Sequence, residues 1–158
     1  MRDKRFVRDH RGGPLKKEQH HQLIKWACSC SGHVLYLSGE KIDERLENAL
    51  EVAHEWVQGN NSVGNARKAS TAAHAVARES SDPIEIAAAR SVGHAVATAH
   101  MADHSLSAAK YALKAVKNAD KSVDEERKWQ DEQLPSEIKE LVLSAGRKEI
   151  SKDLERNI

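Results

Sequence analysis

The chain has 158 residues, which is a usual length for one domain and enough for a hydrophobic core without disulfides or metals. Its formal charge of +1 divides into +5 for residues 1–17 and −4 for residues 18–158, so the body of the chain is mildly acidic. Such a body argues against a nucleic-acid-binding face, and the lack of a long apolar run or a signal-peptide pattern argues against membrane insertion and secretion.

Two cysteines lie two residues apart inside a helical pattern. Side chains at i and i+2 point away from each other on a helix, so Cys28 and Cys30 neither pair nor chelate a metal easily. Two free thiols suit a reducing compartment, and we expect a cytoplasmic protein with no membrane partner.

Helical periodicity runs through nearly the whole chain after Leu15, and alternating strand patterns are absent. The pattern predicts an all-α fold, a single-domain array or bundle of about six to seven antiparallel, alanine-rich helices. The predicted helices span about 16–37, 43–58, 63–80, 83–101, 104–119, 123–133 and 136–152. They form one domain over residues 16–152, between a basic, flexible leader at 1–15 and a C-terminal tail at 153–158.

Cap and turn residues support these boundaries. Glycine and asparagine end helices, whereas serine and aspartate accept hydrogen bonds from the free N–H groups at a helix start. The expected stops are Ser38 with Gly39, and Gly59 with Asn60 and Asn61. The expected starts are Asp43, Ser62, Asp82 with Pro83, and Ser136 after Pro135.

A similar segment recurs with a period of 20 residues, at 49–57, 69–77 and 89–97. Its middle position is always small, as Ala53, Ala73 or Gly93, which lets neighbouring helix backbones approach closely. The next position is always a histidine. His54, His74 and His94 are therefore either a zinc ligand set or half-buried rings that bond to nearby polar groups.

A second polar group follows the third segment. His100 and His104 would share one face if the helix continued through them, whereas Asp103 could instead cap a new helix. Arg90 replaces a small or apolar residue on the inner stripe, so it needs either a partner such as Asp103 or a position at the solvated rim. These residues complete the set of polar core candidates: His54, His74, Arg90, His94, His100, Asp103 and His104.

The second predicted helix has an acidic face. Its four glutamates lie opposite the apolar stripe of the same helix, and they are Glu44, Glu47, Glu51 and Glu55. A second acidic stretch surrounds Trp129. Such faces are either solvated or serve as docking surfaces for a basic partner, whose association they accelerate. The three tryptophans, Trp26, Trp56 and Trp129, are expected to anchor the core.

Motifs of nucleophilic or nucleotide-dependent enzymes are absent, including the G-x-S-x-G turn, the Walker loop and the dinucleotide fingerprint. We therefore expect no catalytic residues, no cofactor and no resident metal.

Several segments resemble a family of immunity proteins associated with bacterial polymorphic toxin systems. The longest runs from Ala88 through the Gly-His-Ala-Val-Ala-Thr-Ala-His stretch that ends at His100, and shorter matches extend over roughly residues 20–145. The sequence departs from the family in its leader and in Leu46, where the family usually has proline. The resemblance implies an α-helical cytosolic protein that protects its own cell by binding a protein toxin.

Three hypotheses follow. The first is an immunity protein that neutralises a toxin by stoichiometric binding without catalysis, with the acidic helix face as its docking surface. The second is a metal-binding helical enzyme or sensor that uses His94, His100, Asp103 and His104. The third is a generic helical interaction scaffold, with homo-oligomers left open.

Overall fold

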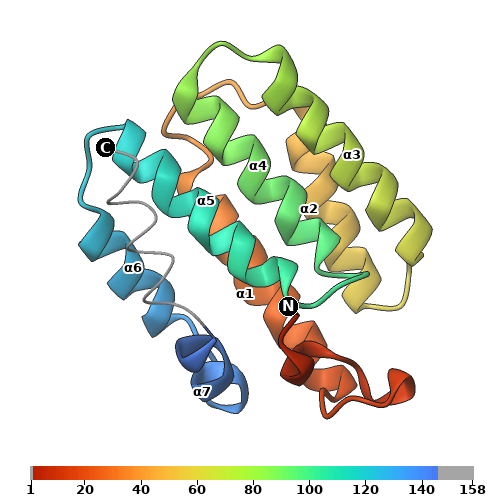
Figure 1. Ribbon diagram of the computed structural model, residues 1–158. Coiled ribbons are helices and arrows are strands. Elements are labelled where there is room, and N and C mark those ends of the chain that lie inside the picture. Colours follow the sequence, from red (N-terminus) through yellow and green to blue (C-terminus); the bar gives the residue numbers. More distant parts are fainter. Residues whose placement is uncertain (1, 146–158) are drawn as a thin grey trace.

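The computed structural model describes residues 2–145 and confirms the all-α prediction (Figure 1). Seven α-helices follow one another in this part of the chain: α1 (Lys17–Val34), α2 (Glu44–Val57), α3 (Val63–Glu79), α4 (Pro83–Ala97), α5 (His104–Asn118), α6 (Val123–Glu132) and α7 (Ser136–Ser144). Two short 3₁₀ turns, η1 (Lys4–Phe6) and η2 (Asp9–Arg11), precede them. The predicted end of the last helix at residue 152 and the tail at 153–158 lie outside the described residues.

Most helices begin where the cap residues predict. The Asp43 carboxylate accepts a hydrogen bond from the backbone N–H of Arg45, and the Ser62 hydroxyl accepts one from Asn65. Pro83 opens α4, where its missing N–H leaves no partner unsatisfied. The prediction for Ser136 is wrong, because it is the first helical residue of α7 and the side chain of the preceding Pro135 cannot cap it.

Helix α4 ends at Ala97, four residues before the predicted end. The Thr98 hydroxyl donates to the His94 carbonyl, and the backbone then tightens through N–H bonds from Ala99 to Val96 and from His100 to Ala97. The resulting turn lets α5 run back along α4 (Figure 1).

Helices α1 and α4 occupy the centre of the array. Helix α4 packs between α3 and α5, and α2 packs against α3, while α1 lies across α4 and α5 (Figure 1). Helices α6 and α7 pack on the other side of α5 and α1. Consecutive helices from α2 to α5 are antiparallel, because their connections are too short for any other path.

The core consists of two apolar clusters joined by alanines. One cluster lies among α1, α2, α3 and α4, and the other lies among the N-terminal segment, α1, α5, α6 and α7. Ala27, Ala95 and Ala108 connect them where α1, α4 and α5 meet. Small side chains permit this close approach, and buried hydroxyls bridge it, since Ser31 and Ser91 lie 2.7 Å apart and Ser91 donates to the Ala108 carbonyl.

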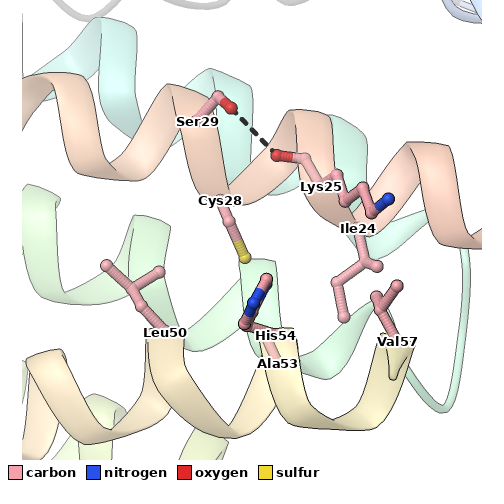
Figure 2. Close-up of a pocket in the computed structure, with 8 residues that line it drawn as sticks. All are labelled: Ile24, Lys25, Cys28, Ser29, Leu50, Ala53, His54 and Val57. Carbon is pink, nitrogen blue, oxygen red and sulfur yellow. Dashed lines mark hydrogen bonds between the residues drawn. The ribbon is translucent and has the colours of Figure 1, made fainter. Parts of the chain in front are cut away.

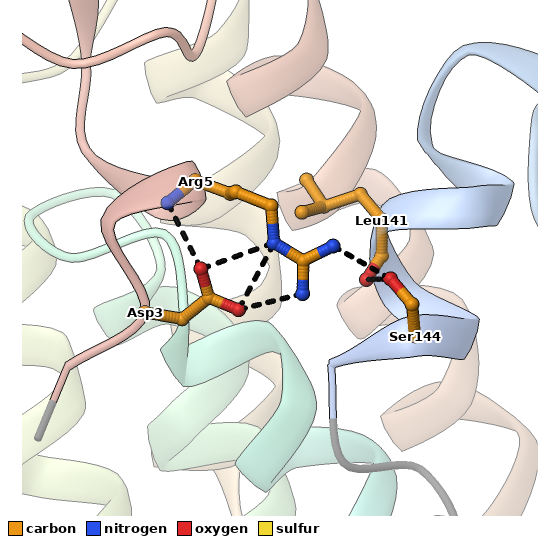
Figure 3. Close-up of polar contacts among 4 residues, drawn as sticks. All are labelled: Asp3, Arg5, Leu141 and Ser144. Atoms are coloured by element: carbon orange, nitrogen blue, oxygen red, sulfur yellow. Dashed lines mark hydrogen bonds and ion pairs between the residues drawn. The ribbon is translucent and has the colours of Figure 1, made fainter.

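Residues 2–15 lie against the helical domain, in contrast to the flexible leader that their composition led us to expect. Phe6 and Leu15 are fully buried in the second apolar cluster. Arg5 bridges Asp3 to the hydroxyl of Ser144 at the end of α7 (Figure 3). The segment packs despite its basic residues, because Phe6 and Leu15 bury hydrophobic area while the charged groups stay at the surface.

Candidate functional site

The structure brings four of the predicted histidines together on one face formed by α3, α4 and the start of α5. Their ring centroids are 5.2 Å apart for His74 and His94, 5.1 Å for His94 and His104, and 5.1 Å for His104 and His100. We call these four residues the histidine row. His54 does not join it, because it is exposed on α2 and contacts Gln58.

The centre of the histidine row is a hydrogen-bonded pair of rings. The Nδ1 atoms of His94 and His104 are 3.0 Å apart, so one ring must donate a proton that the other accepts. Tyr111 stacks on His94 with an interplanar angle of 6°. Burial, followed by the neighbouring charges of His104 and His74, lowers the pKa of His94 to about 4. His94, at the centre of the row, is therefore uncharged at neutral pH.

Arg90 binds the end of the histidine row. Its Nη1 donates to Nδ1 of His74 over 2.7 Å, and because a guanidinium cannot accept, the neutral His74 ring carries its hydrogen on Nε2. Burial and then the charge of Arg90 lower the pKa of His74. Asp103 was one of two alternatives for Arg90, and this pair is not formed, since Asp103 pairs with Nε of Arg2 at 3.4 Å.

The turn after α4 positions the two histidines at the other end of the row. His100 lies in that turn and His104 is the first residue of α5, so their contact does not come from one continuous helix. Asp103 occupies the cap position of α5, but its side chain makes no capping hydrogen bond. Burial is the main cause that lowers the pKa of both His100 and His104.

This arrangement differs from a metal site. The rings form a row in which nitrogen atoms bond to one another and to Arg90, instead of converging on one point. Among residues 2–145, no group of three or more histidine, cysteine, aspartate or glutamate side chains is placed to hold a metal ion. The structure thus brings the proposed metal ligands close together, but they do not surround one point where a metal ion could bind. These residues are His94, His100, Asp103 and His104.

The acidic face lies on α2, whereas the histidine row lies on α3, α4 and the start of α5. Glu44, Glu47 and Glu51 are exposed and Glu55 is half-buried. We call these four residues the acidic row. None of them takes part in an ion pair within the part of the chain that the structure describes.

A groove between α1 and α2 borders the acidic row, and the sequence analysis missed it. Figure 2 shows the Cys28 thiol and the His54 ring facing each other across this groove. Its volume is about 330 Å³, and Ile24, Leu50 and Val57 provide apolar lining. Burial among these side chains raises the pKa of Cys28 to about 12, so its thiol is not a nucleophile at neutral pH. The sequence does not distinguish the groove, because Leu50 and Val57 continue the same apolar stripe as the buried Leu46.

The second acidic stretch is a packed surface. The ring of His33 stacks on Trp129 with centroids 3.5 Å apart, and His33 Nδ1 lies 2.6 Å from a Glu126 carboxylate oxygen. Trp129 is half-buried, as is Trp56. Only Trp26 among the three tryptophans is a buried anchor, with its indole N–H donating to the Gln130 carbonyl over 2.8 Å.

The profile of a family described as "Imm-5 like putative immunity protein" matches residues 13–137, which is most of the chain. No curated protein and no solved structure shows a significant match. No helix in the described range combines the length and apolar character that crossing a membrane requires.

Proposed function

We propose that this chain, which belongs to the Imm-5 like putative immunity protein family, protects a bacterial cell by binding and neutralising one protein toxin in the cytoplasm. The family match over residues 13–137 is the observation that carries the proposal. Neutralisation by stoichiometric binding requires a stable surface complementary to the toxin and no catalytic residues.

The acidic row is the docking surface that we propose for the toxin. Its carboxylates project from α2 without an ion pair in the described part of the chain, so a basic partner would not have to displace an internal one. Opposite charges across an interface accelerate association and exclude partners of the wrong sign.

The neighbouring groove adds an apolar contact to this charged surface. His54 lines the groove and lies one helical turn from both Leu50 and Glu51, so the groove and the acidic row share an edge. A toxin segment that places an apolar side chain among basic ones would fill the groove and pair with the row. Such a buried anchor with a charged rim is typical of tight protein interfaces.

The product of the adjacent gene is the partner to test. Co-expression should rescue growth of cells that produce this toxin, and the two purified proteins should form a one-to-one complex. A control chain with Glu47→Lys and Glu51→Lys should fold but rescue less well. If the wild-type chain neither rescues growth nor binds the toxin, the proposal is refuted. If it does both and the control chain is equally effective, only the docking surface is wrong.

A further inference from the structure

Arg90 is a half-buried cation without a carboxylate partner. Only its bond to His74 is formed, and no carboxylate oxygen lies within 4.0 Å of it in the described residues. A guanidinium has five N–H donors in a planar fork that matches two oxygens of a carboxylate or phosphate. No Arg90 nitrogen is among the buried side-chain atoms without a partner in the described residues, so the rest of its fork is open to solvent and can take an anion.

The charges around the histidine row have one dominant sign. The cations that act on its rings come from the N-terminal segment, α3, α4 and α5, and they are Arg2, Arg67, Arg78, Arg90 and Lys110. Asp103 is a carboxylate that acts on His100 and His104, and Arg2 already pairs with it. A positive face therefore exists on a body whose net charge is negative, and it attracts anions.

The rings beside Arg90 supply neutral donors. Nε2 of His74 faces α4 at Gly93, so the donors come from the neighbouring pair of His94 and His104. In this pair, whichever ring accepts at Nδ1 carries a hydrogen on Nε2. Neutral N–H groups next to a fixed cation can bind an oxyanion without first losing a proton of their own.

We infer that the face formed by Arg90 and the histidine row is an oxyanion-binding site for a carboxylate or phosphate group. Arg90 is its cation, and the imidazoles of His74 and His94 border the bound group. The site is independent of the proposed toxin surface, since it lies on α3, α4 and α5 and takes a ligand of the opposite charge.

The test uses the full chain, with inorganic phosphate and acetate as probes at pH 7 and constant ionic strength. Histidine side-chain NMR should show saturable shifts for His74 and His94, and comparison of the two anions tells a phosphate site from a carboxylate site. Arg90→Gln should weaken binding by roughly tenfold or more, because charged hydrogen bonds are lost. Arg90→Lys should weaken binding less, because it retains the charge without the fork.

Arg11→Gln is the matched control, because it removes an equal charge from an exposed arginine in η2. It should leave anion binding unchanged, and circular dichroism should show that all variants are folded. Absence of a saturable shift with either anion would overturn the inference. Equal binding by wild type and a folded Arg90→Gln variant would overturn it too.

Discussion

Gly93 lies where the ring of His74 crosses α4, so adding a single methyl group there tests the packing of the histidine row. An alanine Cβ at this position would lie 2.6 Å from Nε2 and 2.7 Å from Cε1 of His74. Moving the ring would strain or break the hydrogen bond from Nη1 of Arg90 to Nδ1 of His74, which is 2.7 Å long. Gly93→Ala must therefore displace the ring, the helix or both.

The net effect follows from two opposing contributions. Replacing glycine by alanine inside a helix stabilises by about 0.5–1 kcal/mol, whereas overpacking costs about 1–3 kcal/mol. We expect Gly93→Ala to destabilise the protein by about 0.5–2 kcal/mol and to lower its Tm by roughly 2–6 °C. Gly64→Ala in α3 is the control, because its Cβ would meet only the Ser62 hydroxyl at an ordinary 3.7 Å. It should raise the Tm slightly.

Urea and thermal unfolding of Gly93→Ala, of His74→Ala and of the variant that combines both measure the contact between the two residues. Removing the ring should make the alanine harmless, so the double variant should be more stable than the sum of the single effects predicts. A Gly93→Ala protein that melts at or above the wild-type temperature would refute the close packing of this site.

Four further predictions concern charge, pH, the N-terminal segment and metal. Glu47→Lys with Glu51→Lys should leave the circular dichroism spectrum unchanged, yet slow association with the toxin and reduce its dependence on salt; unchanged rates at low and high salt would exclude the acidic row. The folded-state pKa values of His20 and His94 are depressed from 6.5 to about 4, so the unfolded chain binds more protons between these values. Stability measured by urea unfolding should therefore fall as the pH falls from about 6.5 to about 4, and a flat profile would contradict burial of neutral rings. Phe6→Ala should destabilise by about 3–5 kcal/mol, while a free leader would show no change in Tm. Exhaustive chelation should leave helicity and Tm unchanged, and a loss restored by zinc would favour the metal hypothesis.

The sequence by itself determined the helices and most of their starts. Asp43, Ser62 and Pro83 act through N–H groups within the next few residues, so their effect depends on local sequence alone. The exposed position of Glu44, Glu47 and Glu51 was equally predictable, because 100° per residue places them opposite the apolar stripe of their own helix.

Only the tertiary structure decided which polar groups meet. His54 and His74 hold equivalent places in the repeated segment, yet only His74 reaches the histidine row, since α3 packs directly on α4 at Gly93. Asp103 was one candidate partner for Arg90, but Asp103 pairs with Arg2 after the turn at the end of α4, and Arg90 binds His74. Burial of Phe6 and the groove beside Cys28 likewise depend on distant helices. Periodicity specifies which face of a helix turns inward, whereas the crossing and register of neighbouring helices decide what that face touches.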